Sequence, residues 1–134
     1  MEDIQQKRLA IWNQYDEALR DLSAATGSFS VPGIPGYATN NAHMYYVVMN
    51  NAADRESLIN HLRKEGIHAV FHYLSLHASP LYGEKHDGRA LPMADHYSDC
   101  LIRLPLFYEL TPDDVDRIIQ AIGSWVSAGR ASAV

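Results

Sequence analysis

Apolar residues recur at three- and four-residue steps over residues 3–25, and this spacing predicts a long amphipathic helix at the start of the chain. Its apolar stripe consists of Ile4, Ile11, Trp12, Tyr15, Ala18, Leu19 and Leu22. Charged residues such as Lys7 and Glu17 mostly occupy the other side. Because Trp12 and Tyr15 add a large apolar area to a terminal helix, we expect the stripe to cover a partner domain as well as its own core.

A connector, a strand and a second helix are predicted next. Residues 27–41 contain several Gly and Pro and no periodic pattern, which is typical of a connector. The continuous apolar run 43–49 predicts a strand buried on both faces. A helix follows over 55–65, with Asp54 as its N-cap and Gly66 as the residue after its C-cap.

A second strand is predicted over 67–73, with Ile67, Ala69, Phe71 and Tyr73 on one face and His68, Val70 and His72 on the other. The polar, Gly-containing stretch 82–91 predicts a surface loop. Pro92 then begins a short helix through about Asp99, in which we expect Ala94 and Tyr97 to face inward.

The last part of the chain contains a third strand, 101–104, and a final helix. Thr111 is followed by Pro112 and by two acidic residues, which is a strong helix start. The apolar stripe of this helix is formed by Val115, Ile118, Ile119, Ile122 and Val126. Residues 129–134 are small and polar, and we expect them to form a frayed tail.

These elements predict a single α/β domain over residues 1–134, with a sheet of about three strands and helices packed on it in two layers. Within it, residues 1–26 form a long N-terminal helix, 27–41 a connector and 42–128 the α/β unit.

Composition and charge fit an ordinary globular protein and exclude several classes. The chain has 134 residues, of which 47% are hydrophobic and 20% charged, and this is enough for one sizeable core. A formal net charge of −5 gives no reason to expect nucleic acid or an anionic membrane as a partner. Cys100 is the only cysteine, no apolar run is as long as a membrane span, and no signal peptide is recognised, so we expect a cytoplasmic protein.

Candidate chemistry is concentrated where the second strand ends. His72, Tyr73, His77 and Tyr82 follow one another on a segment that changes from a strand pattern to Ser, Pro and Gly. Such loops on a rigid element often bind ligands. His68 cannot share a metal ion with His72, because residues four apart on a strand are separated by about 13 Å. We therefore predict no metal site.

Five motifs carry a resemblance to a known family. They are Lys7-Arg8 with Ile11-Trp12 and Tyr15, Val31-Pro32-Gly33-Ile34-Pro35, Ala42-His43-Met44-Tyr45-Tyr46, Phe71-His72-Tyr73-Leu74-Ser75-Leu76-His77 and Arg103-Leu104-Pro105-Leu106-Phe107. In this order and spacing they resemble the C-terminal small domain of the DegT/DnrJ/EryC1 sugar aminotransferases, over about residues 4–126. No single motif is diagnostic, since the specificity comes from their order.

The resemblance implies pyridoxal phosphate chemistry on a fold type I scaffold, in a homodimer that binds a nucleotide sugar. In that family the Schiff-base lysine and the phosphate-holding groups belong to a large N-terminal domain, which this sequence does not include. The three lysines here are Lys7, Lys64 and Lys85, and none is expected to follow a strand into a pocket. We therefore expect no cofactor-binding and no catalytic residue in this chain, and no transamination by it alone.

The resemblance also implies roles for single residues in a complete enzyme. His72 and His77 are expected to contact the nucleotide-sugar substrate, although capping of backbone groups at the strand end is the alternative. For Tyr73, we expect substrate contact and core packing equally. Arg103 could reach a substrate phosphate, but an ion pair on an exposed face is the more common role for such an arginine. For His43 we expect a structural hydrogen bond, and for Cys100 burial.

Two functional hypotheses remain. The first is one wall of the substrate site of a nucleotide-sugar aminotransferase, which binds substrate only together with the large domain. The second is a free-standing, non-catalytic interaction or oligomerisation module, and self-association is expected in either case. A small enzyme that uses His72 and His77 as acid and base is disfavoured, because no nucleophile or paired carboxylate accompanies them.

Overall fold

The computed structural model describes residues 2–131. Its helices are α1 (Glu2–Thr26), α2 (Ala52–Lys64), α3 (Pro92–Cys100) and α4 (Pro112–Ala131). Its strands are β1 (Phe29–Ser30), β2 (Tyr45–Met49), β3 (Val70–Phe71) and β4 (Leu101–Leu104), and two short 3₁₀ turns are η1 (Leu76–Ala78) and η2 (Gly83–Lys85). The predicted α/β class with a long N-terminal helix is confirmed.

The four strands form one antiparallel sheet in the order β1-β2-β4-β3. Tyr46 of β2 and Val70 of β3 both lie opposite Arg103 of β4, so Arg103 occupies the middle of one sheet face. We predicted about three strands because β1 lies inside the expected connector 27–41. A two-residue strand is too short to show an alternating pattern, so β1 is defined only by its pairing with the end of β2.

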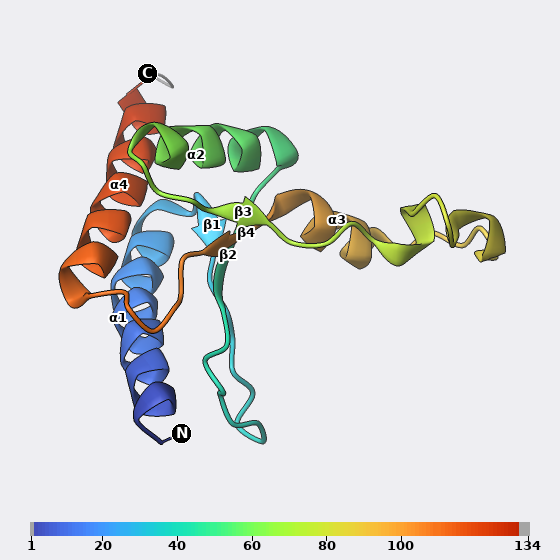
Figure 1. Ribbon diagram of the computed structural model, residues 1–134. Coiled ribbons are helices and arrows are strands. Elements are labelled where there is room, and N and C mark those ends of the chain that lie inside the picture. The colour runs from blue at the N-terminus through green and yellow to red at the C-terminus, as the bar shows by residue number, and fades with distance from the viewer. Residues whose placement is uncertain (1, 132–134) are drawn as a thin grey trace.

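The two faces of the sheet differ. Helices α1, α4 and α2 lie together on one face, as Figure 1 shows, and they form the second layer of the domain. On the other side the segment that follows β3, together with α3, extends away from the sheet as an arm. Here only a small cluster of Val48, Cys100 and Leu101 is buried, with Tyr46 packed against it. The burial predicted for Cys100 is confirmed.

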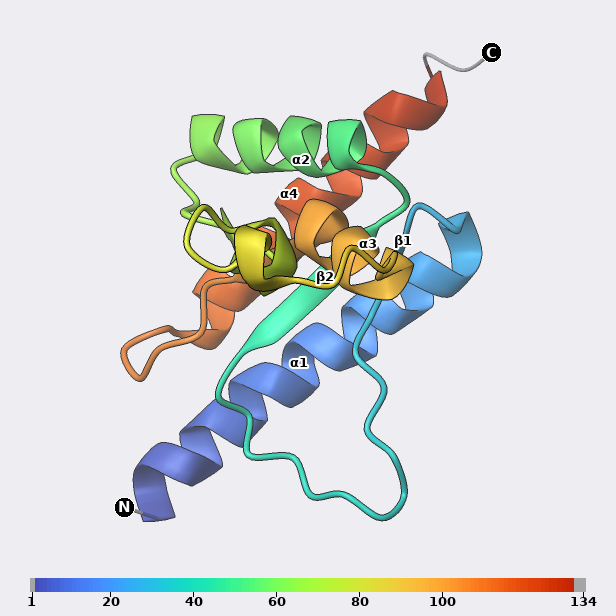
Figure 2. The ribbon, with the colours of Figure 1, turned by 90° about the vertical axis from the view of Figure 1, so that its right-hand side faces the viewer.

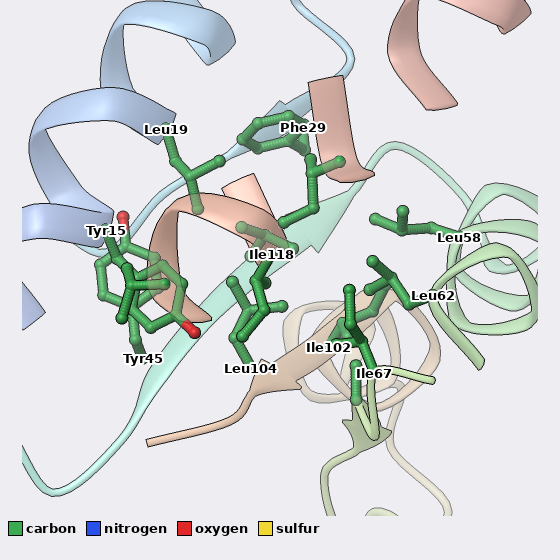
Figure 3. Close-up of a cluster of buried hydrophobic side chains, with 14 of the residues drawn as sticks. Tyr15, Leu19, Phe29, Tyr45, Leu58, Leu62, Ile67, Ile102, Leu104 and Ile118 are labelled. Atoms are coloured by element: carbon green, nitrogen blue, oxygen red, sulfur yellow. The ribbon is translucent and has the colours of Figure 1, made fainter. Parts of the chain in front are cut away.

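The main core is formed between the sheet and the helix layer (Figure 3). Tyr15 of α1 and Tyr45 of β2 are completely buried, and their rings stack at 5.2 Å between centroids. Trp12 meets the Tyr45 ring edge-on at 5.3 Å, and only 7% of its surface is exposed. We expected this stripe to cover a partner domain as well as its own core, but its aromatic residues Trp12 and Tyr15 are buried within this chain.

Helix ends follow the predicted chemistry with one correction. The N-cap of α2 is Asn51 and not Asp54, because the Asn51 side chain accepts from the backbone N–H of Asp54 at 2.9 Å. Gly66 follows the C-cap of α2 as predicted, with φ of +74° and the backbone hydrogen bonds of a Schellman motif. At α4, Thr111 and Asp114 exchange hydrogen bonds as a capping box.

The second predicted strand is much shorter than expected. Ile67 and Ala69 are buried, but Phe71 and Tyr73, which we placed on the same inward face, are 51% and 75% exposed. The chain leaves the sheet after Phe71, so the alternation that continues in the sequence no longer has a core to face. Ala94 and Tyr97 of α3 are exposed for the same reason, because α3 lies on the arm.

The C-terminal helix extends further than predicted. Helix α4 continues to Ala131, so the start of the expected frayed tail at residue 129 is helical. The rest of that prediction, residues 132–134, lies outside the described residues. Across residues 2–131, no helix combines the length and apolar character that crossing a lipid bilayer requires.

Candidate ligand-binding site

The arm is held in place by polar contacts between its loop and α3. The backbone N–H of Ser75 donates to the Ser98 hydroxyl at 3.2 Å, and the Arg55 guanidinium of α2 donates to the Ser98 carbonyl at 3.3 Å. Arg55 also lies 6.0 Å from the centre of the Phe71 ring. Ser98 therefore connects the loop after β3 to the helix layer. The loop residues that follow Ser75 are directed along α3.

A cavity of about 640 Å³ lies between this loop and α3. Its aliphatic lining comes from Leu74, Leu76, Leu91 and Leu101, and its aromatic lining from Tyr73, Tyr82 and Tyr97. Figure 2 shows the molecule with this arm facing the viewer. A volume of this size can hold a ligand of the size of a nucleotide.

His72 contributes an unpaired polar atom to this cavity. Its Nδ1 is buried and has no hydrogen-bond partner among the described residues. Burial, with a smaller effect of the nearby Arg103 charge, lowers the pKa of His72 below the ordinary histidine value. The ring is therefore neutral at pH 7, and its buried Nδ1 is left without a hydrogen-bond partner within the described residues.

His77 also lines the cavity and is held by α3. Its Nε2 is 2.8 Å from Oδ1 of Asp95, and only 17% of its side chain is exposed. The His86 ring packs against it at 5.3 Å between centroids. His86 Nε2 donates in turn to the Arg89 carbonyl at 2.9 Å. Two imidazoles are therefore packed together on one side of the cavity.

Two cations border the same cavity. Lys85 and Arg89 both line it, and the Lys85 ammonium lies 5.5 Å above the Tyr82 ring. Lys85 lies in the polar loop in which we placed it, and that loop folds back so that Lys85 borders the cavity. The lining contains no carboxylate, so the arrangement favours an anionic ligand with an apolar or aromatic part.

The structure brings together three of the four predicted site residues. His72, Tyr73 and His77 line the cavity, whereas Arg103 on β4 does not and acts on it only through its charge near His72. No ion pair of Arg103 is found within residues 2–131. His43 makes the structural hydrogen bond expected, through Nδ1 to the Asn41 side chain at 2.8 Å.

Tyr82, which we included in the candidate segment, lines the cavity, but we missed four further lining residues, Lys85, His86, Arg89 and Tyr97. We assigned the first three to a solvent-facing loop and Tyr97 to the core. A signal was present, since Lys85, His86 and Arg89 follow closely after His77 and precede a helix start. A loop that returns toward a helix directly after the candidate segment is expected to cover that segment.

A second cavity of about 420 Å³ lies on the helix side of the sheet, between the ends of α2 and β4. It is bordered by His68, Phe107, Asp114 and Arg117. His68 thus lies away from His72 and His77, in agreement with the strand argument against a shared metal ion. The opposite charges of Asp114 and Arg117 give this cavity no clear preference for one ligand charge.

Comparison with known proteins adds a family match. The model of the DegT/DnrJ/EryC1/StrS aminotransferase family matches residues 1–123. Among solved structures, the aminotransferase TlmJ from Streptoalloteichus hindustanus is 26% identical with a TM-score of 0.82, and the match covers 96% of this chain and 33% of TlmJ. A DegT DnrJ EryC1 StrS aminotransferase from Brucella abortus is 29% identical with a TM-score of 0.75, over 92% of this chain and 31% of that protein.

The same fold occurs in more distant proteins. DesV from S. venezuelae, solved in complex with a ketimine intermediate, has a TM-score of 0.81 at 23% identity, over 93% of this chain and 32% of DesV. At that identity the likeness shows the fold alone. The chain spans about a third of the length of the solved proteins that it matches.

Proposed function

Because the chain belongs to the DegT/DnrJ/EryC1/StrS aminotransferase family, we propose that it forms one wall of the nucleotide-sugar site of a sugar aminotransferase. It corresponds to the C-terminal small domain of such an enzyme and does not catalyse transamination alone. The observation that supports the proposal most is the cavity on the arm, in which His72, Tyr73 and His77 lie together. With a single, buried cysteine, the domain works in a reducing, cytoplasmic compartment.

The cavity lining suits the two chemical parts of a nucleotide sugar. Tyr73, Tyr82 and Tyr97 offer flat apolar surfaces on which a base or a sugar ring can pack. Lys85 and Arg89 offer positive charge for a diphosphate. The unpaired Nδ1 of His72 offers a ring nitrogen that can pair with a hydroxyl group, as donor or acceptor according to its tautomer.

The lining does not fit pyridoxal phosphate. The cofactor needs a lysine for the imine and an acidic partner for the pyridinium nitrogen. Lys85 is present, but its ammonium lies over the half-exposed Tyr82 ring, and no carboxylate lines the cavity. η2 is a single three-residue turn and provides no helix N-terminus for a phosphate. Cofactor chemistry therefore belongs to the part of such enzymes that this chain does not span.

The motifs around His72, His43 and Arg103 favour a particular substrate within the family. They are most similar to those of dTDP-4-amino-4,6-dideoxygalactose transaminase, so we assign a dTDP-4-oxo-6-deoxyhexose as the substrate of the complete enzyme. Such enzymes act as homodimers. The isolated wall offers only half of the contacts, and we expect it to bind dTDP with a Kd on the order of 1 mM, about −4 kcal/mol.

A titration of the ¹⁵N-labelled chain with dTDP tests this function. We expect saturable chemical-shift changes in residues 72–77, 82–89 and 94–98, because these segments line the cavity. Thymidine, which lacks the diphosphate, should bind more weakly, and the Lys85→Ala variant should reduce the preference for dTDP. Absence of any saturable change at 10-fold higher ligand than the expected Kd, or changes confined to the second cavity, would contradict the proposal.

A second candidate function is a free-standing, non-catalytic association module. The specific observation in its favour is that Trp12 and Tyr15 are buried by the chain itself, so the domain completes its core without a partner. Association would then use the arm, on which Leu74, Leu76, Leu81 and Met93 are each more than 60% exposed. Exposed large apolar residues of this kind favour self-association.

A further inference from the structure

We propose that Asp95 is a positioning residue that fixes the orientation and the proton of His77. The inference rests on the proposed function, since it concerns the same cavity. Asp95 Oδ1 lies 2.8 Å from His77 Nε2, and the two residues are on different elements, α3 and η1. Asp95 is half-exposed and does not itself line the cavity. It therefore acts on a ligand only through His77.

The geometry determines which ring nitrogen of His77 carries the proton. A carboxylate only accepts hydrogen bonds, so Nε2 must donate to Asp95. In the neutral ring Nδ1 then has a free lone pair, because the hydrogen bond of one nitrogen sets the state of the other. No hydrogen bond of Nδ1 to another residue is found within residues 2–131. Nδ1 is thus available to a ligand hydroxyl, or to a ligand phosphate when the ring is protonated.

Helix α3 is suited to this role because it holds the loop at two points. Asp95 and Ser98 are three residues apart, so they lie on the same face of the helix. Ser98 holds the backbone of Ser75 at 3.2 Å, and Asp95 holds the side chain of His77 at 2.8 Å. The first contact places the loop, and the second places the ring on it.

His86 restricts the ring from the other side. Its imidazole lies 5.3 Å from that of His77, and its own Nε2 donates to the Arg89 carbonyl. His86 Nε2 also lies 3.7 Å from Oδ1 of Asp87. His77 is therefore confined between an acceptor on α3 and an aromatic ring on the following loop. Loss of Asp95 removes the acceptor and leaves the tilted ring contact with His86 in place, so the proton of His77 can occupy either ring nitrogen.

Nuclear magnetic resonance of the ligand-free chain tests the positioning directly. At a pH where the ring is neutral, the ring nitrogens of His77 should report a single tautomer with the proton on Nε2. Asp95→Ala should shift both ring-nitrogen signals toward an average of the two tautomers, and Asp95→Glu should restore much of the difference. Asp99→Ala is the matched control, since it removes the same charge from the same helix. Unchanged His77 signals in Asp95→Ala, or an equal shift in Asp99→Ala, would overturn the proposal.

Ligand binding tests the consequence. Asp95→Ala should weaken dTDP binding by about tenfold, which is the lower end of what loss of an orienting partner costs a metal-bound histidine. In a His77→Ala background the same substitution should have no further effect, because Asp95 acts through His77. An equal loss in both backgrounds would contradict this. If the wild-type chain does not bind dTDP, the proposed function fails, while the tautomer measurement still decides the role of Asp95.

Discussion

Arg103 affects the site through its charge alone. It lies in the middle of the open sheet face, opposite Tyr46 and Val70, and outside the cavity lining. Burial is the main cause of the lowered pKa of His72, and the Arg103 charge is the next. A histidine with a lowered folded-state pKa is stabilising only while it is neutral. Its effect is therefore to destabilise the fold as the pH decreases below the ordinary histidine pKa of 6.5.

Substitution of Arg103 tests the effect of its charge on His72. Arg103→Gln should raise the pKa of His72 toward the ordinary value, because the repulsion of the imidazolium is removed. It should also reduce the loss of stability between pH 7 and pH 5. Titration of the His72 ring protons measures the first effect, and thermal unfolding at the two pH values measures the second. Arg63→Gln on the exposed side of α2 is the control, and an equal shift in that variant would show a general charge effect.

Some of the residues that line the cavity could be predicted from the sequence, and others were missed. His72, Tyr73 and His77 could be found from the sequence, because they follow one another where a strand pattern breaks. Lys85 and Arg89 were missed, because their position in the lining depends on the return of the chain toward α3, which the following helix start only hinted at. Tyr97 was assigned to the core because an aromatic residue at helical spacing usually packs inward. On the arm there is no core for it to meet.

Gly66 shows what the elements require of the backbone. It has φ of +74°, which is unfavourable for any residue with a Cβ. Its N–H and that of Ile67 close the end of α2 through hydrogen bonds to Arg63 and Leu62. The chain therefore turns at this point from the helix layer into the sheet.

A matched pair of glycine substitutions tests this. Gly66→Ala should destabilise the domain by about 1–2 kcal/mol, because alanine at positive φ is strained. Gly123→Ala in α4 should be neutral or stabilising by about 0.5–1 kcal/mol, because a Cβ there meets no atom within 4 Å and glycine is a poor helix former. Urea unfolding of both variants gives the comparison. Equal effects of the same sign would contradict the conformational explanation.

Elements with strong local signals were predicted well. Helix α4 was expected from its Thr111 cap and apolar stripe, and both are found. β1 and the true length of β3 could not be predicted, because two-residue strands are set by pairing with β2 and β4 and not by their own pattern. Likewise Asn51 and Asp54 both suit an N-cap, and the side-chain geometry alone distinguishes them.

At the scale of the whole molecule, the apolar residues that a second molecule could cover lie on the arm rather than on the aromatic stripe of α1. Trp12 and Tyr15, which we expected to cover a partner domain as well, are both buried within this chain. We therefore expect any self-association of the chain to use the apolar arm residues. Sedimentation velocity should then show that Leu81→Ser reduces association. Ile34→Ser, on the long loop between β1 and β2, should not change it, and equal behaviour of the two variants would exclude the arm as the contact.

We propose that this chain carries a wall that contacts the substrate and not the centre that forms the imine. Incubation with one equivalent of pyridoxal phosphate, borohydride reduction and peptide mass spectrometry test it most directly. We predict no more adduct at Lys7, Lys64 or Lys85 than in the urea-unfolded chain. Lys85 is the critical position, because it is the lysine that lines the cavity. A stoichiometric adduct at Lys85 that depends on the folded state would contradict the account.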